Sequence, residues 1–251
     1  MESGAADTDR RDFSGIRLDD ADFSGARLHS PNCERLTITD GWLVNADISG
    51  YIEGMRVNGV EVGPLVSAEL DRRFPQRVKL RATDPAGLAD AWTMLEEVWR
   101  QTTARARLLP EARLRERVDQ EWSFLETLRH LILATDCWLG RMVLQLERPY
   151  HPWGVAGSWL TDPRELGIDP DAAPSFDQVL PVWRGRADSV QETIASVTAA
   201  ELERLLTPPA APGHPDHPES MLHCLHVILD EYWLHSTYAN RDLAILEGHR
   251  G

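Results

Sequence analysis

The chain has 251 residues, 42% of them hydrophobic, and its 40 acidic side chains exceed its 26 basic ones to give a net charge of −14. This surplus of negative charge argues against nucleic acid and anionic membranes as partners, because both would repel it. There is no run of eighteen apolar residues, and the first dozen residues are polar, so neither a membrane span nor a signal peptide is expected. We therefore predict a soluble, cytoplasmic protein that binds neither nucleic acid nor membrane.

The three cysteines are Cys33, Cys137 and Cys224. Their odd number and wide spacing exclude a disulfide framework and a Cys-x-x-Cys zinc site. Although a thiolate is a good zinc ligand, free cysteine is among the most commonly buried residue types. We expect Cys137 and Cys224 to be reduced core residues.

An apolar residue recurs at every fifth position between residues 11 and 50, which fits neither the 3.6-residue period of a helix nor the 2-residue period of a strand. The quintets Ala-Asp-Phe-Ser-Gly and Ala-Asp-Ile-Ser-Gly recur in the same segment. This segment resembles the pentapeptide-repeat family, which implies a small right-handed quadrilateral β-helix. Eight repeats make about two coils, fewer than a stacked array needs for independent stability, so we expect a cap supported by another domain. The eight positions are Phe13, Leu18, Phe23, Leu28, Cys33, Ile38, Leu43 and Ile48.

After the repeats, the Asn58-Gly59 pair lies between two short alternating runs and predicts a β-hairpin with a two-residue turn. Pro64 is expected to close the sheet edge, and a short helix is expected over Ser67 to Arg73, ending before Pro75. The predicted domains are a disordered tail at 1–10, a β cap at 11–66, a connecting segment at 67–84 and a helical bundle at 85–251.

Four long amphipathic segments fill the rest of the chain, which makes the predicted fold mainly α. Asp84 before Pro85, and Ser123 with Glu126 three residues later, are helix-start signals. Helices of this length with few strand signals specify a four-helix bundle, and a long crossover at 147–174 indicates a topology other than simple up-down-up-down. The expected helices run from about Pro85 to Pro110, from Ser123 to about Leu146, from Ser175 or Phe176 to about Ala195 with Pro181 inside, and from near Ser220 to near Gly248, with a short helix at 199–206.

The last of these helices carries Glu231 and His235, four residues apart, so that a carboxylate and an imidazole project from one face. A divalent metal is the obvious object for such a pair. A catalytic zinc usually has three protein ligands and one open position, so a third donor must come from elsewhere. The best candidate is His130, which lies in the apolar stripe of the second helix. Taken alone, a histidine in such a stripe is more often a hydrogen-bonded core residue.

This donor set belongs to a wider pattern made of Trp122, Ser123, Glu126, His130, Trp138, Glu231, His235 and the run Arg241-Asp242-Leu243. Over residues 84–247 the pattern resembles the DinB superfamily of four-helix metalloproteins. The commonest form of that pattern has one histidine on the second helix and a His-x-x-x-His pair on the fourth. Here Glu231 replaces the first histidine of the pair, which resembles the mycothiol-dependent maleylpyruvate isomerase branch.

The resemblance implies a metal-dependent enzyme in which His130, Glu231 and His235 bind zinc or nickel and leave positions open for a thiol or water. Coordination lowers the pKa of either molecule. The thiol would be mycothiol or a similar low-molecular-weight thiol, and the reaction an S-transfer or an isomerisation. Two alternatives stay open: a metal-dependent hydrolase and a non-enzymatic binding or stress-response scaffold. No residue is assigned a catalytic role, and the chain could form a homodimer, as such bundles frequently do.

A rival set on the same helix, formed by His223, His226 and Asp230, also shares one face, but that face differs from the face of Glu231 and His235. We prefer Glu231 and His235 because this pair matches the resemblance and because aromatic residues flank it. If the crossover folds over the mouth of the bundle, its aromatic residues would line a substrate pocket. The predicted pocket residues are Tyr150, His151, Trp153, His226 and Tyr238.

Overall fold

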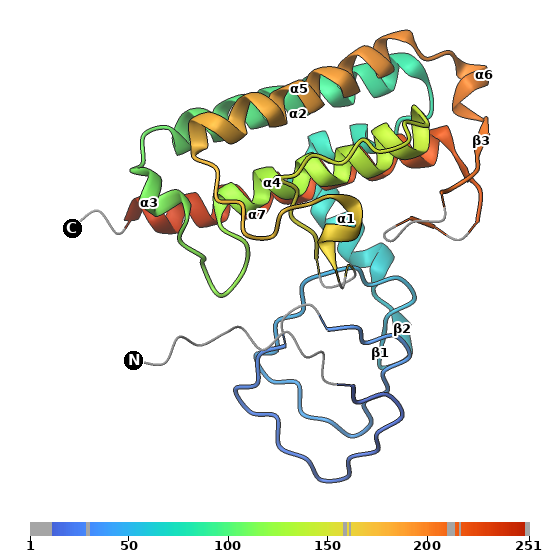
Figure 1. Ribbon diagram of the computed structural model, residues 1–251. Coiled ribbons are helices and arrows are strands. Elements are labelled where there is room, and N and C mark those ends of the chain that lie inside the picture. The colour runs from blue at the N-terminus through green and yellow to red at the C-terminus, as the bar shows by residue number, and fades with distance from the viewer. Residues whose placement is uncertain are drawn as a thin grey trace. The chain divides into compact units, whose positions relative to one another are not determined.

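The computed structural model describes residues 12–28, 31–157, 160, 162–209, 214–215 and 217–248, and Figure 1 shows its elements. The chain divides into two compact units, Met1–Thr37 and Ile38–Gly251. The predicted disordered tail at 1–10 lies outside the described residues. Of the helices in the described part of the chain, none combines the length and the apolar character needed to cross a bilayer.

The repeats at the N-terminus form regular turns. Left-handed φ values occur at five-residue steps, for example at Gly15, Asp20 and Gly25 with φ of 70°, 54° and 73°. No strand is assigned to the described residues before position 56, and the repeat side chains are exposed, with Phe13 at 64% and Ile48 at 61%. Stacked coils would bury such side chains in a continuous core. The five-residue period is therefore visible in the backbone, whereas the quadrilateral β-helix stays a prediction.

The predicted hairpin is confirmed as strands β1 (Arg56–Val57) and β2 (Val60–Glu61), which pair antiparallel. Asn58 and Gly59 between them have φ values of 50° and 80°, the left-handed pair that a type I′ turn requires. Pro64 does not end the sheet as predicted, because it lies in the first turn of helix α1 (Gly63–Arg73). Proline suits that position, since the first turn of a helix has no use for its missing N–H.

Residues 75–81 form a 3₁₀ helix, η1 (Pro75–Arg81), in the segment predicted to connect the two domains. Asp71 of α1 forms ion pairs with Arg77 and Arg81 of η1, each at 2.6 Å, and so holds the two helices together. Leu80 of η1 is buried in the main hydrophobic core. The segment is therefore structured and packs against the bundle.

The four predicted long helices are present and form a bundle. Helix α2 packs against α5 and α7, and α4 also packs against α5 and α7, as Figure 1 shows for the α2–α5 and α4–α7 pairs. Helix α4 continues directly into a π-helix, η2, and short elements occupy the connections. The bounds are α2 Pro85–Ala106, α3 Glu111–Leu114, α4 Phe124–Thr135, η2 Asp136–Val143, η3 Pro163–Leu166, α5 Phe176–Ser196, α6 Ala199–Leu202, β3 Leu205–Leu206, β4 Glu219–Ser220 and α7 Met221–Gly248.

Aromatic side chains from three helices meet in the bundle core. Trp92 and Trp99 come from α2, Trp183 from α5 and Tyr232 from α7, and each is at most 4% exposed. The indole N–H of Trp99 donates to the backbone carbonyl of Tyr232 at 2.9 Å, and the Tyr232 ring lies 4.9 Å from the Trp92 ring. Burial of such large side chains is a main source of folding free energy. It also sets the rotation of α7, because Tyr232 can face the core in only one orientation of the helix.

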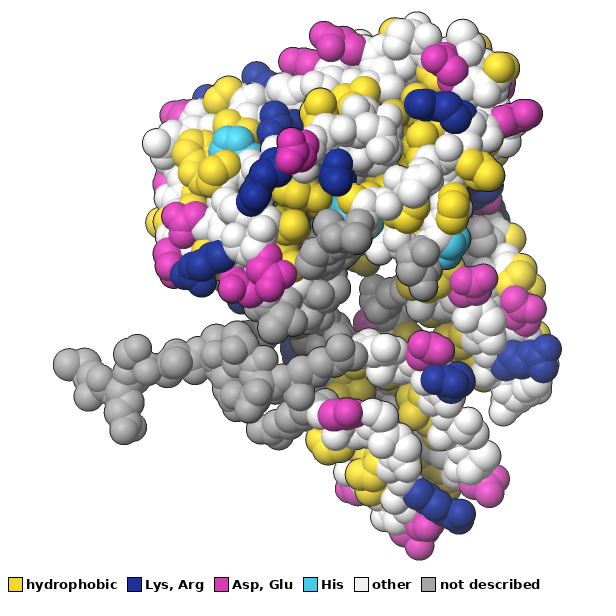
Figure 2. All heavy atoms as spheres, turned by 45° about the vertical axis from the view of Figure 1, so that its right-hand side comes forward, with side chains coloured by type: hydrophobic (Ala, Val, Ile, Leu, Met, Phe, Trp, Pro, Cys, Tyr) yellow, Lys and Arg dark blue, Asp and Glu magenta, His cyan; other side chains and the backbone are white. Residues whose placement is uncertain are grey.

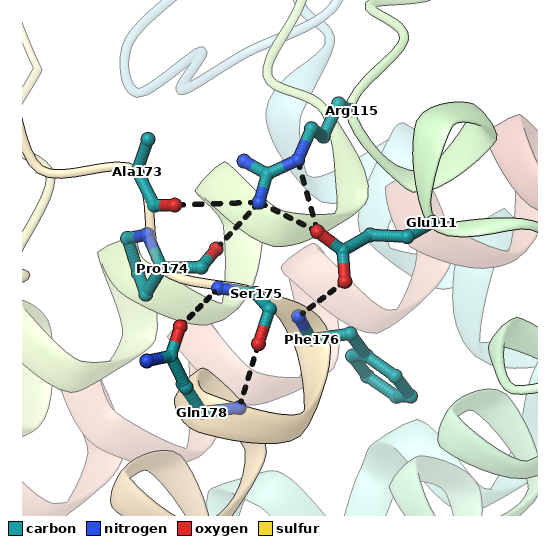
Figure 3. Close-up of polar contacts among 7 residues, drawn as sticks. All are labelled: Glu111, Arg115, Ala173, Pro174, Ser175, Phe176 and Gln178. Carbon is teal, nitrogen blue, oxygen red and sulfur yellow. Dashed lines mark hydrogen bonds and ion pairs between the residues drawn. The ribbon is translucent and has the colours of Figure 1, made fainter.

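Helix α4 begins with the predicted Ser123–Glu126 capping box, and α5 begins with a second capping box that was not predicted. At α5, Ser175 accepts from the amide of Gln178 at 3.3 Å, and the Gln178 side chain accepts from the amide of Ser175 at 2.8 Å (Figure 3). Arg115 donates to the two carbonyl groups that precede Ser175, and Glu111 accepts from the first amide of α5. Residues at the two ends of α3, Glu111 and Arg115, therefore hold the end of the crossover and the start of α5 in place.

The protein surface mixes charges of both signs. On the face shown in Figure 2, basic and acidic side chains are interspersed. Several ion pairs join residues three or four apart within a helix, such as Arg72 with Glu69 at 2.7 Å in α1 and Arg100 with Glu97 at 2.6 Å in α2. Exposed pairs of this kind add little to stability because water screens them. Stability of the bundle therefore comes from the apolar core.

A buried ion pair joins η2 to α5. The carboxylate of Asp136 is 3% exposed in its side chain, lies 2.5 Å from Nε of Arg186 and accepts from the backbone N–H of His151 at 2.8 Å. Burial raises the pKa of Asp136 to about 6, and the opposing effect of Arg186 only partly compensates. The π-helix, the crossover and α5 therefore meet at one costly buried charge.

We predict that this carboxylate makes stability depend on pH. The pKa of an unfolded aspartate is about 3.9, so the folded state binds the proton more tightly and stability falls as pH rises from about 4 to about 6. The expected loss in the free energy of unfolding is up to about 3 kcal/mol, from a shift of roughly two pKa units. Urea denaturation from pH 4 to pH 7 measures it, and Asp136→Asn should remove this slope. Parallel curves for the two proteins would contradict the prediction.

Candidate metal centre

Three potential metal ligands from two helices meet at one point. His130 comes from α4, and Glu231 and His235 come from α7. Nε2 of His130 lies 3.1 Å from Oε2 of Glu231, and Nε2 of His235 lies 3.2 Å from the same oxygen. One donor atom from each residue lies within 4.8 Å of the other two, and no other group in the described part of the chain has this geometry. The structure thus brings together the three residues that the sequence analysis selected.

The bundle core explains why these side chains converge. Tyr232 is fixed in the aromatic core, so its neighbour Glu231 projects about 100° around the helix, towards α4. His235 follows one turn later on the same face. His130 faces α7 because α4 packs directly against that helix. The helix packing brings the three donors together.

The crossover fixes the orientation of the His130 ring. Nδ1 of His130 lies 3.1 Å from the carbonyl oxygen of Val155, which can only accept, so this nitrogen carries a hydrogen. The same stretch is held to α4 by Arg129, whose Nε donates to the carbonyl of Trp153 at 2.8 Å. Nε2 of His130 therefore faces Glu231. A backbone carbonyl is one of the usual partners of the second ring nitrogen in a metal-ligating histidine.

The electrostatics of the group suit a cation. Burial alone would raise the pKa of Glu231, but hydrogen bonds from His130 and His235 outweigh it and hold this pKa well below its usual range. Burial lowers the pKa of His235, despite the hydrogen bond to Glu231 that opposes the shift. The Glu231 side chain remains 30% exposed, whereas the two histidine side chains are 11% and 12% exposed. The site is therefore half-buried, with access beside the carboxylate.

Two aromatic side chains, Trp122 and Tyr238, pack against the histidine donors. Trp122 was given no site role in the sequence analysis. The ring of Trp122 lies 4.4 Å from that of His130 and 5.8 Å from that of His235. Tyr238 meets His235 edge-on at 5.9 Å. The position of Trp122 directly before the N-cap Ser123 was visible in the sequence, but its contact with a residue on α7 was not.

The other predicted pocket residues have the following contacts. His226 lies 2.7 Å from the carbonyl of Ala82, and Tyr150 lies 3.1 Å from His214. The rings of His151 and Trp153 pack edge-on at 5.0 Å. Only Tyr238, among the five residues proposed for the pocket, has a ring contact with one of the three donors in the described structure. The pocket lining stays a prediction.

The rival set is not assembled in the described part of the chain, since His223, His226 and Asp230 do not form a group of metal-binding geometry. His223 instead lies 3.9 Å from Glu219, and its ring packs edge-on against Trp138.

The two core cysteines are not reactive thiolates at neutral pH, because burial raises the pKa of Cys137 and Cys224 to about 12.

The bundle and its donor group define a mainly α protein with a candidate metal centre. The profile of the DinB superfamily matches residues 94–239, and the chain belongs to that superfamily. The matched region includes all three donors and excludes the N-terminal repeats. Searches of curated proteins and of solved structures found no match.

We predict that His235→Ala lowers zinc affinity by at least about 100-fold, because one of three donors is lost. Isothermal titration calorimetry of the metal-free protein measures this, and circular dichroism should show an unchanged helix content. His226→Ala is the matched control, since His226 lies on the same helix outside the donor group, with its Nε2 2.7 Å from the Ala82 carbonyl. Retention of one tightly bound zinc by the His235→Ala protein would contradict the assignment.

Proposed function

We propose that the protein is a metal-dependent enzyme of the DinB superfamily, in which His130, Glu231 and His235 hold one zinc or nickel ion. The supporting observation is that two imidazole Nε2 atoms converge on a single carboxylate oxygen, at 3.1 and 3.2 Å. These atoms lie at hydrogen-bond distance from one another. A cation between them would satisfy the same three donors, so the residues fit the ion.

When bound, zinc or nickel acts as a Lewis acid that lowers the pKa of a thiol or water at its open position. The chain supplies the orientation. Val155 holds the His130 ring, and Trp122 and Tyr238 place aromatic surface beside the imidazoles, which limits water on that side. Reactants would approach beside Glu231, where the group is most exposed.

We propose a low-molecular-weight thiol of the mycothiol type as co-substrate, in an S-transfer or an isomerisation of a small molecule. The support is the glutamate at position 231, which is the variant of the superfamily pattern that the sequence resembles. We further propose that the crossover residues Tyr150, His151 and Trp153, with His226 and Tyr238 of α7, line the substrate pocket. A cytoplasmic location, a homodimer and a pentapeptide β-helix over the repeats belong to the same proposal.

Zinc should stabilise the folded protein, because it binds the assembled donors and has no such site in the unfolded chain. At a free zinc concentration of 100 times Kd, the free energy of unfolding should rise by about 2.7 kcal/mol, which raises Tm by several degrees. Differential scanning calorimetry with zinc and then with a chelator measures the shift. The His235→Ala protein is the control and should not respond. Equal Tm values with and without metal would favour the non-enzymatic scaffold.

The cobalt-substituted protein should distinguish a thiol-dependent enzyme from a hydrolase. Cobalt(II) reports its ligands by absorption, and a sulfur ligand adds an intense near-ultraviolet charge-transfer band. We expect this band to grow and saturate when a cysteine-derived thiol is added, and to stay absent with the matching alcohol. The thiol proposal fails if the thiol leaves the spectrum unchanged. That result would favour a hydrolase that uses metal-activated water.

A further inference from the structure

The two imidazoles of the metal centre are held in different ways. Nδ1 of His130 is fixed by the Val155 carbonyl. For His235, the hydrogen-bond and ion-pair contacts within the described chain all run through Nε2, to Glu231. A metal-ligating histidine usually donates its second N–H to a partner that fixes the ring. Another interaction must therefore orient His235.

Ring packing takes that role. The indole of Trp122 stacks on His235 with an interplanar angle of 24° and also lies against His130, so it touches one donor from each helix. Tyr238 also packs against His235, with its ring nearly perpendicular, at 84°. Stacked and edge-on contacts are the preferred arrangements of aromatic rings. Together they restrict rotation of the His235 ring.

Trp122 is itself held firmly from both directions. On its C-terminal side, the Ser123 capping box fixes the chain where α4 begins. On its N-terminal side, Glu121 forms an ion pair with Arg241 of α7 at 2.5 Å. The guanidinium of Arg241 also lies over the Tyr238 ring at 5.4 Å. Arg241 therefore contacts both Tyr238 and the residue that precedes Trp122.

The chain before this ion pair adopts a conformation that few residues tolerate. Asp119 and Gln120 both have left-handed φ values, 51° and 67°. The turn is closed by a hydrogen bond from the Glu121 amide to the Val118 carbonyl at 2.9 Å. Non-glycine residues adopt such φ values only where the surrounding structure holds them. The turn directs Trp122 back towards α7.

We propose that Trp122 is a positioning residue of the metal centre. Its indole holds the His235 ring, and through direct contact the His130 ring, in the orientation that points both Nε2 atoms at Glu231. This inference rests on the proposed function of these three residues as metal ligands. Without the indole, His235 loses its stacked ring contact, whereas His130 keeps its bond to Val155. The affinity for metal falls and the donor geometry becomes heterogeneous.

Replacement of Trp122 tests this role. Trp122→Leu should lower zinc affinity by about 10- to 100-fold, the range found when an orienting partner of a metal ligand is removed. Trp122→Phe keeps an aromatic ring and should stay within about threefold of the wild type. Trp138→Leu is the matched control, because Trp138 is also half-buried and contacts His223, which lies outside the donor group. Its zinc affinity should equal that of the wild type.

Two further measurements separate positioning from general damage. In the metal-free protein, NMR of the histidine ring C–H protons should show ring-current shifts at His130 and His235 that Trp122→Leu removes. In the cobalt form, Trp122→Leu should broaden the visible bands, whereas Trp138→Leu should not. Trp122→Met retains apolar bulk and replaces the leucine variant if that variant does not fold.

The outcomes distinguish this inference from the proposed function. If the wild type binds zinc and the leucine or methionine variant binds it equally tightly, with the same cobalt spectrum, Trp122 has no positioning role and the proposed function stands. If the wild type binds no zinc, the proposed function fails. In that case, ring-current shifts that survive in the variant also overturn the orientation of His235 by Trp122.

Discussion

One carboxylate oxygen, Oε2 of Glu231, lies between imidazole nitrogens from two helices, and the candidate metal centre depends on this contact. A half-buried negative charge is costly unless donors surround it. Here the donors are His130 and His235, so the α4–α7 interface contains a charged group that is satisfied only while both helices are in register. The neighbouring Tyr232 in the aromatic core sets that register.

The crossover connects this site to the rest of the bundle through backbone groups. Its carbonyls at Trp153 and Val155 accept from Arg129 and His130, two consecutive residues of α4. Four residues earlier than Val155, the amide of His151 donates to Asp136, which pairs with Arg186 of α5. A long connection is thus held along one helix by polar contacts. Its path determines the ring orientation of a proposed metal ligand.

The N-terminal repeats and the bundle differ in how far their apolar side chains are buried. In the bundle, amphipathic periods place apolar residues such as Leu95 and Leu128 in a shared core, where they are fully buried. In the repeats, the five-residue period sets where the backbone turns, yet side chains such as Leu18 and Leu43 stay more than half exposed. Regular turns follow from local conformational preference, whereas burial requires neighbours to stack against. The match to the DinB superfamily, residues 94–239, lies within the bundle.

Features that depend on residues close together in the chain could be predicted from the sequence. Apolar periods, the capping box at Ser123, the Asn58-Gly59 turn and the four-residue spacing of Glu231 and His235 each depend on residues close together in the chain. The tertiary structure alone decided the contacts that span long separations, such as His130 with Glu231, 101 residues apart, and Trp122 with His235. It also decided that Val155 supplies a carbonyl to His130, which any residue type could do. Side-chain patterns encode helix faces, but they do not encode which backbone group or ring will meet that face, because this depends on how all four helices pack together.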